Sequence, residues 1–107
     1  MPMINVEYNT DQVPDKDIQM LCEAIREIVS FATGIEDVFV YGNSARIKVQ
    51  IAPIEIFVSM SASKIDNLDE LFSKIETSIK TWKAKTQFLY PINLTVIPMN
   101  WKFTTGI

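Results

Sequence analysis

The stretch Pro2-Met3-Ile4-Asn5-Val6-Glu7-Tyr8 (PMINVEY, residues 2–8) alternates apolar and polar side chains directly after a proline. A period of two is the signature of a half-buried β-strand. The same design returns in PIEIFVSM, residues 53–60, where a proline again precedes alternating apolar side chains. These two similar openings predict that the chain contains two copies of one folding unit.

A polar loop and then an amphipathic helix follow each of these two strands. In the first copy, apolar residues recur at spacings of three and four over residues 18–32, and Gly34 suits a left-handed helix end. In the second copy, the apolar stripe runs over residues 68–82, and Asp66 or Asn67 precedes it as the N-cap. Both helices therefore have one face to bury.

Further strands are expected after each helix. Residues 36–51, EDVFVYGNSARIKVQI, predict two short strands around a turn at Gly42-Asn43. Residues 88–97 predict another strand, which Pro98 ends, and residues 100–107 can add a last short one. Each copy thus follows the order strand, helix, strand.

The expected fold is α+β in a single domain over residues 1–107, with internal repeats at about 2–41 and 53–97. Two β-α-β units with right-handed crossovers give a four-stranded mixed sheet with both helices on one face. The hydrophobic content of 48% is high for so short a chain. We therefore expect the uncovered face of the sheet to pack against other copies of the chain.

Composition excludes several classes of function. The net charge of −3 argues against nucleic-acid binding, and the absence of histidine excludes Ser-His and Cys-His catalytic pairs and a histidine metal site. Cys22, the single cysteine, lies on the first apolar helix stripe and is expected in the core. With no signal peptide, no membrane-spanning run and no glycine-rich phosphate loop, we expect a cytoplasmic protein without cofactor or metal.

The duplicated β-α-β pattern, the Met-Pro start, the turn before AP-IEIFVSM and the late VIPM before a short aromatic tail resemble the tautomerase superfamily. This superfamily includes proteins similar to 4-oxalocrotonate tautomerase, carboxymethyl-hydroxymuconate isomerase and macrophage migration inhibitory factor. The features are most similar to a bacterial branch of unknown function, and the resemblance covers nearly the whole chain. It implies a homotrimer whose sheets line a central barrel, and a small carbonyl or enol compound as substrate.

Pro2 is the candidate catalytic residue. An α-amino group has a pKa of about 7.7–8.0, and burial in an apolar pocket lowers it further. Once Met1 is removed, as the resemblance implies, the secondary amine of Pro2 becomes a neutral base near pH 7, suited to proton transfer beside a carbonyl. The alternative is that Pro2 merely begins an edge strand, where its missing N–H costs nothing.

The sequence indicates the substrate-binding residues less clearly than the candidate base. The family pattern has one arginine in the loop after the first strand and one within the next strand, but residues 9–12 and 38–40 contain none. The candidates are Arg46 and Lys48, expected on a strand after the turn, and the hydroxyl of Tyr41. Arg46 has the forked geometry that suits a carboxylate. Solvent-exposed cations on a strand face are the alternative.

Three hypotheses follow. The first is a homotrimeric, cofactor-free tautomerase with Pro2 as general base. The second is a non-catalytic trimeric binding or scaffold protein on the same fold. The third is a monomeric ferredoxin-like module that binds RNA or a metabolite through exposed Phe39 and Phe57, although these lack basic neighbours. In either trimer, Trp101 and Phe103 are expected to anchor a neighbouring subunit.

Overall fold

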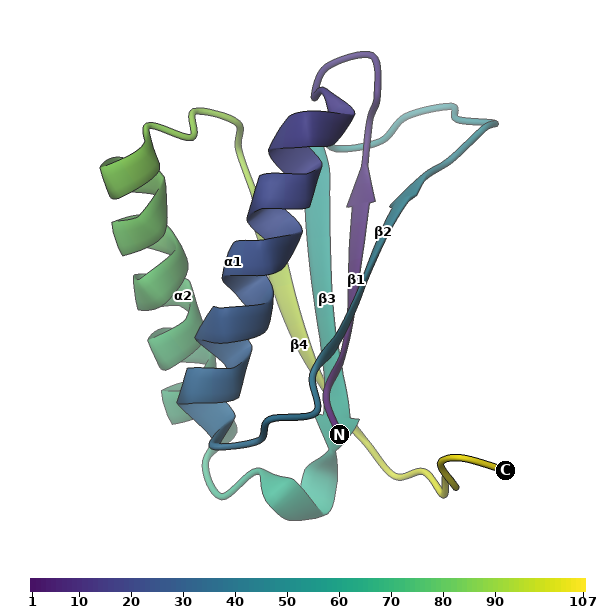
Figure 1. Ribbon diagram of the computed structural model, residues 1–107, viewed down its shortest axis with the longest axis vertical. Helices are drawn as coiled ribbons and strands as arrows, with labels where there is room; N and C mark the ends of the chain where they lie inside the picture. The colour runs from purple at the N-terminus through teal and green to yellow at the C-terminus, as the bar shows by residue number, and fades with distance from the viewer.

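The computed structural model describes residues 1–107 and shows two helices packed side by side on one face of a single sheet (Figure 1). The elements are β1 (Met3–Tyr8), α1 (Asp15–Thr33), β2 (Phe39–Ser44), β3 (Ile54–Ser61), a 3₁₀ turn η1 (Ala62–Lys64), α2 (Leu68–Thr86) and β4 (Asn93–Met99). The strand order is β2-β1-β3-β4, with β1 parallel to β2 and β3 parallel to β4. The expected α+β fold with a duplicated unit is confirmed.

The two copies meet at the central strand pair. Strands β1 and β3 run antiparallel, with Met3 opposite Ser59 and Tyr8 opposite Ile54. The two prolines that open the copies therefore lie at opposite ends of the sheet. The carbonyl of Pro2 accepts a hydrogen bond from the Phe39 N–H at 3.2 Å, whereas the carbonyl of Pro53 accepts one from the Asn9 N–H at 3.0 Å.

The core lies between the sheet and the helices, as the periodicities predict. Most of its buried side chains come from alternate positions of the central strands and from one stripe of each helix: Ile4 and Val6; Ile54, Ile56, Val58 and Met60; Ile18, Leu21, Ile25 and Val29; Leu71, Ile75 and Ile79. The connecting segments add Val13, Val38 and Phe88. No polar or charged residue is buried in it. Neither helix is apolar enough over its length to span a membrane.

Local signals set the helix ends. Gly34 adopts φ 71° and its N–H donates to the Ser30 carbonyl at 2.8 Å, which closes α1 as expected. Of the two candidate N-caps of α2, Asn67 performs the role, because its side chain accepts a hydrogen bond from the Glu70 N–H at 3.0 Å.

The expected turn at Gly42-Asn43 is wrong, because β2 runs straight through both residues to Ser44. A Cβ at position 42 would lie 3.3 Å from Ile18 Cγ2 and 3.5 Å from Cys22 Sγ. Gly42 is therefore a point of close approach between α1 and β2 rather than a bend. The second strand expected in this region is also absent, since residues 45–53 form no strand.

The C-terminal expectations also need correction. Strand β4 begins at Asn93 rather than at residue 88, and it continues through Pro98 to Met99. It tolerates Pro98 because it lies at the edge of the sheet, where a missing N–H leaves no ladder bond unmade. Residues 100–107 form no strand.

The face of the sheet opposite the helices is uncovered, and its composition changes from end to end. At the end nearer Pro2, Met3 lies level with Phe39 on one side. At the other end, Glu7 lies opposite both Asn43 and Glu55 on the neighbouring strands. The open face is therefore apolar and aromatic at one end and acidic at the other.

Candidate functional site

Pro2 lies fully buried at the beginning of β1. Alternation along the strand places its ring on the same side of the sheet as the core residues Ile4 and Val6. Its carbonyl is held by the Phe39 N–H. Pro2 is thus buried on the helix-covered side of the sheet and fixed to β2 by this main-chain bond.

The C-terminal tail lies beside this end of the sheet. If the β1–β3 register is continued by two residues, Met1 comes level with Ser61. The Ser61 hydroxyl oxygen accepts a hydrogen bond from Trp101 Nε1 at 2.8 Å, and the Trp101 ring meets Phe103 edge-on at 6.1 Å. Figure 1 shows the N-terminus, the end of β4 and the tail at the same end of the molecule. Trp101 is therefore anchored within its own chain, while Phe103 stays half exposed.

Arg46 and Lys48 do not lie on a strand, contrary to expectation. Both belong to the loop that joins β2 to β3, which lies at the Tyr8 end of β1. The six residues of β1 span about 20 Å at ~3.3 Å per residue. A single chain therefore keeps both cations far from Pro2.

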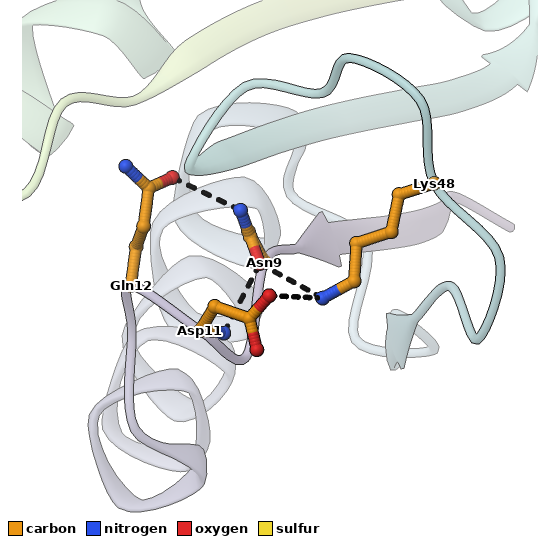
Figure 2. A network of polar contacts seen from close by, with 4 residues as sticks. All are labelled: Asn9, Asp11, Gln12 and Lys48. Atoms are coloured by element: carbon orange, nitrogen blue, oxygen red, sulfur yellow. Dashed lines mark hydrogen bonds and ion pairs between the residues drawn. The ribbon is translucent and has the colours of Figure 1, made fainter.

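The ammonium group of Lys48 is already engaged within the chain (Figure 2). It donates to Asn9 Oδ1 at 2.9 Å and pairs with Asp11 Oδ2 at 3.1 Å. Asn9 in turn accepts from the Asp11 main-chain N–H at 3.0 Å and donates to Gln12 Oε1 at 3.2 Å. These contacts fasten the β2–β3 loop to the loop after β1. Arg46 makes no ion pair.

Tyr41 lies on the open face of β2, level with Asn5, and its side chain is about half exposed. It lies two residues beyond Phe39, whose N–H bonds the Pro2 carbonyl, and its side chain makes no hydrogen bond to Pro2, Arg46 or Lys48. The sequence-predicted site residues thus occupy three places in one chain: the start of β1, the middle of β2 and the loop beyond β2.

Two hollows lie at the end of the sheet opposite Pro2. One, of about 730 Å³, lies between residues 9–12 and 46–51 and includes Arg46 and Lys48. The other, of about 600 Å³, is bordered by Glu7 and Glu55 on the open face. Neither hollow is lined by Pro2.

Sequence analysis missed two polar features. The first is the facing pair Glu7 and Glu55, which became visible only from the antiparallel register. The second is the hydrogen bond that the Tyr8 hydroxyl donates to Asp15 Oδ1 at 2.7 Å, which raises the pKa of Tyr8 to about 12. By contrast, burial raises the pKa of the Cys22 thiol, in keeping with its expected packing role.

No model of a known protein family matches the sequence, and no curated protein matches it. Solved structures do match over nearly the whole chain. A 5-carboxymethyl-2-hydroxymuconate delta-isomerase gives a TM-score of 0.68 at 12% identity, covering 99% of this chain and 89% of its own. A fused 4-OT, described as an asymmetric trimer, gives 0.66 at 15% identity, covering 97% and 92%.

A domain of unknown function from Sebaldella termitidis is similar too, with a TM-score of 0.65, 14% identity and coverage of 100% of this chain and 98% of that one. At these identities the likeness concerns the fold. The duplicated unit, the strand order β2-β1-β3-β4 and the shared covered face agree with it. The chain therefore has the same fold as these solved structures.

Proposed function

We propose that this chain is a cytoplasmic, cofactor-free keto–enol tautomerase that acts as a homotrimer, with the amine of Pro2 as general base after removal of Met1. The observation that carries the proposal is the position of Pro2, buried at the apolar and aromatic end of the sheet. The activities named for structures of the same fold support it, among them a delta-isomerase.

The chemistry needs one group that accepts and returns a proton. The neutral amine of Pro2 takes the proton of the enol hydroxyl or of the carbon next to the carbonyl. The resulting ammonium then delivers a proton to the other of these two atoms, so that no cofactor is consumed. The negative charge that develops on oxygen is stabilised by a hydrogen-bond donor or a cation.

In this proposal a neighbouring copy supplies the groups that complete the site. Arg46 is the better candidate for the oxyanion or a substrate carboxylate, because Lys48 is already paired with Asp11. Tyr41 is exposed on the open face and is the candidate hydroxyl donor. Because Arg46 and Lys48 lie at the other end of β1 from Pro2 in their own chain, they can act on its substrate only across a subunit boundary.

The uncovered sheet face supports self-association. Aromatic and apolar side chains there are half exposed, Phe39 at 45% and Tyr41 at 49%. A sheet with one bare face is stabilised when that face packs against another layer. The fused 4-OT of the same fold is described as a trimer, which favours three copies over two.

The test combines intact mass, oligomeric state and activity. We expect untagged protein to lack Met1, to sediment as a trimer and to ketonise an enol such as phenylenolpyruvate. Pro2→Ala should lower kcat/KM by about a hundredfold or more, the usual range for loss of a general base. A variant whose Pro2 amine is blocked by one extra N-terminal residue should be inactive. Full activity of that blocked variant contradicts the proposal.

The second candidate function is a non-catalytic trimeric binding or scaffold protein. It is favoured by the engagement of Lys48 with Asp11 and by the distance of both candidate cations from Pro2. It predicts that Met1 is retained in protein made without a tag, and that the protein is trimeric without ketonising the enol. Intact mass therefore separates the two functions before any substrate is tried.

A further inference from the structure

The outer surface of the helix layer contains a groove between α1 and α2. Figure 1 shows the two helices side by side, running in opposite directions, so that the end of α1 lies beside the beginning of α2. Two hollows of about 560 and 450 Å³ lie between them, and Thr77 and Ser78 border both. The first hollow reaches Met20 and the second reaches Phe31. The groove therefore follows α1 for roughly 17 Å at ~1.5 Å per residue.

Phe31 is a large apolar side chain that the chain leaves uncovered beside this groove. It is 93% exposed, and Met20, at the other end of the groove, is 39% exposed. Both residues belong to the helix layer, on the other side of the sheet from the open face, so packing of the open face against other copies does not cover them. An exposed aromatic ring at the border of a groove is typical of a surface that contacts a protein partner.

The two walls of the groove carry opposite charges. The α1 wall has Glu23 and Glu27, which are exposed and form no ion pair, and no cation of α1 borders either hollow. The α2 wall has Lys74 and Lys85. Lys74 is paired with Glu70 at 3.6 Å, whereas Lys85 has no ionic partner. A complementary occupant therefore presents cations toward α1 and a carboxylate toward Lys85.

The shape of the groove favours a helix as the occupant. Its floor has the small, half-buried side chains of Ala24, Ala32 and Ser78, which allow another helix to approach to the usual 8–10 Å between axes. Its length accommodates about three helical turns at ~5.4 Å per turn. An extended peptide would find no sheet edge here, because both walls are helices whose main chains bond internally, whereas a helix satisfies its own main chain.

Charge argues against a second copy of this chain as the occupant. The main apolar stripes of α1 and α2 are already buried in the core. The outer surface of α1 that presents Met20 and Phe31 also presents Glu23 and Glu27. If that surface of a second copy entered the groove, its carboxylates would meet the same acidic wall, and like charges would oppose the contact.

We propose that the groove between α1 and α2 binds an amphipathic helix of another protein, whose apolar face has basic residues along one flank and acidic residues along the other. The apolar face covers Phe31 and Met20. The basic flank contacts the α1 wall, and the acidic flank contacts Lys85. Because the two flanks differ, the helix lies in the groove in one direction only. The interaction does not depend on the chemistry proposed for Pro2.

A designed peptide tests the proposal. The probe is a fluorescein-labelled helix of about 20 residues, with Leu and Ala on one face, Lys along one flank of that face and Glu along the other. Fluorescence anisotropy with the full-length protein at low salt should show saturable binding. Phe31→Ala should raise Kd about tenfold or more, because it removes the apolar anchor. The fold should survive, since Phe31 is exposed. Arg26→Ala, exposed on α1 but bordering neither hollow, is the matched control and should leave Kd unchanged.

Charge exchange tests the two walls. A second peptide with Glu along both flanks should bind about tenfold or more weakly, because one flank then meets the acidic wall. Glu23→Lys/Glu27→Lys should restore its binding. The control Glu36→Lys/Asp37→Lys makes the same change in net charge just beyond α1 and should not restore it.

Three results overturn the proposal. The first is the absence of saturable binding of the probe with two different flanks. The second is equal binding of both peptides to the parent protein. The third is a loss of self-association in sedimentation of Phe31→Ala when neither peptide binds, which would make a second copy the occupant.

Discussion

Neutralising one of the two glutamates that face each other on the open sheet face should stabilise the protein. Glu7 and Glu55 are register partners on β1 and β3, and alternation places both side chains on the uncovered face. The Glu55 carboxylate accepts a hydrogen bond from Asn93 Nδ2 at 2.9 Å, but neither glutamate has a cationic partner. Like charges directly opposite each other destabilise a sheet.

The structure sets the size of the effect. Directly opposed residues have their Cβ atoms about 4.5–5.5 Å apart, so the two carboxylates lie at a distance of about 6 Å. Two unit charges at that distance repel by about 0.7 kcal/mol in water and about 2.8 kcal/mol at an effective dielectric constant of 20. Both side chains are half-buried. We therefore expect a repulsion of about 1 kcal/mol between them.

A double-mutant cycle measures this repulsion. Urea unfolding of Glu7→Gln, Glu55→Gln and the double variant at pH 7 and low salt gives the free energy of unfolding of each. Each single variant should gain about 1 kcal/mol, and the double variant should gain no more, because the first substitution already removes the repulsion. Salt at 1 M, where the Debye length is about 3 Å, should reduce the gain.

Two results refute the reasoning. If the gains of the two single variants add in the double variant, the carboxylates are not coupled. If either single variant is less stable than the parent, the two carboxylates do not repel each other measurably in the folded protein. Glu27→Gln, on the exposed face of α1 without an ion pair, is the matched control and should change the stability by less than about 0.5 kcal/mol.

Three further predictions concern stability. Asn67→Ala should lower the free energy of unfolding by about 1 kcal/mol in urea titrations, since it removes the side-chain cap of α2; an unchanged midpoint would contradict the capping role. Gly42→Val should cost about 1–3 kcal/mol by overpacking against Ile18, whereas equal stability would show that α1 can move away. The hydrogen bond to Asp15 raises the pKa of Tyr8 from 10.0 to about 12. The contribution of this bond to the stability of the folded protein is therefore complete below pH 10 and is lost as the pH rises through 12. An ultraviolet titration of tyrosine ionisation should show a step near pH 12 in the parent protein that is missing in Tyr8→Phe. If the step missing in Tyr8→Phe lies near pH 10 instead, the hydrogen bond to Asp15 is contradicted.

The sequence by itself was sufficient for the elements that depend on local periodicity. Alternation at Ile4 and Val6 predicted β1, the spacing of Leu71 and Ile75 predicted α2, and the capping chemistry of Gly34 was correct. The repeated unit also predicted the sheet with both helices on one face. These inferences succeed because the side of an element on which a side chain lies is determined by the period of that element.

Only the tertiary structure decided which residues come together. Gly42 looked like a turn residue, but it pairs with Val6 of β1 within a strand, at a point where α1 comes close. Pro2 and Arg46 looked like members of one site, yet the topology of the sheet puts them at opposite ends of the molecule. Residues 46–51 have a strand pattern without a strand. The physical reason is the same in each case: pairing and close approach depend on partners distant in sequence or on another chain, and a local pattern does not specify those partners.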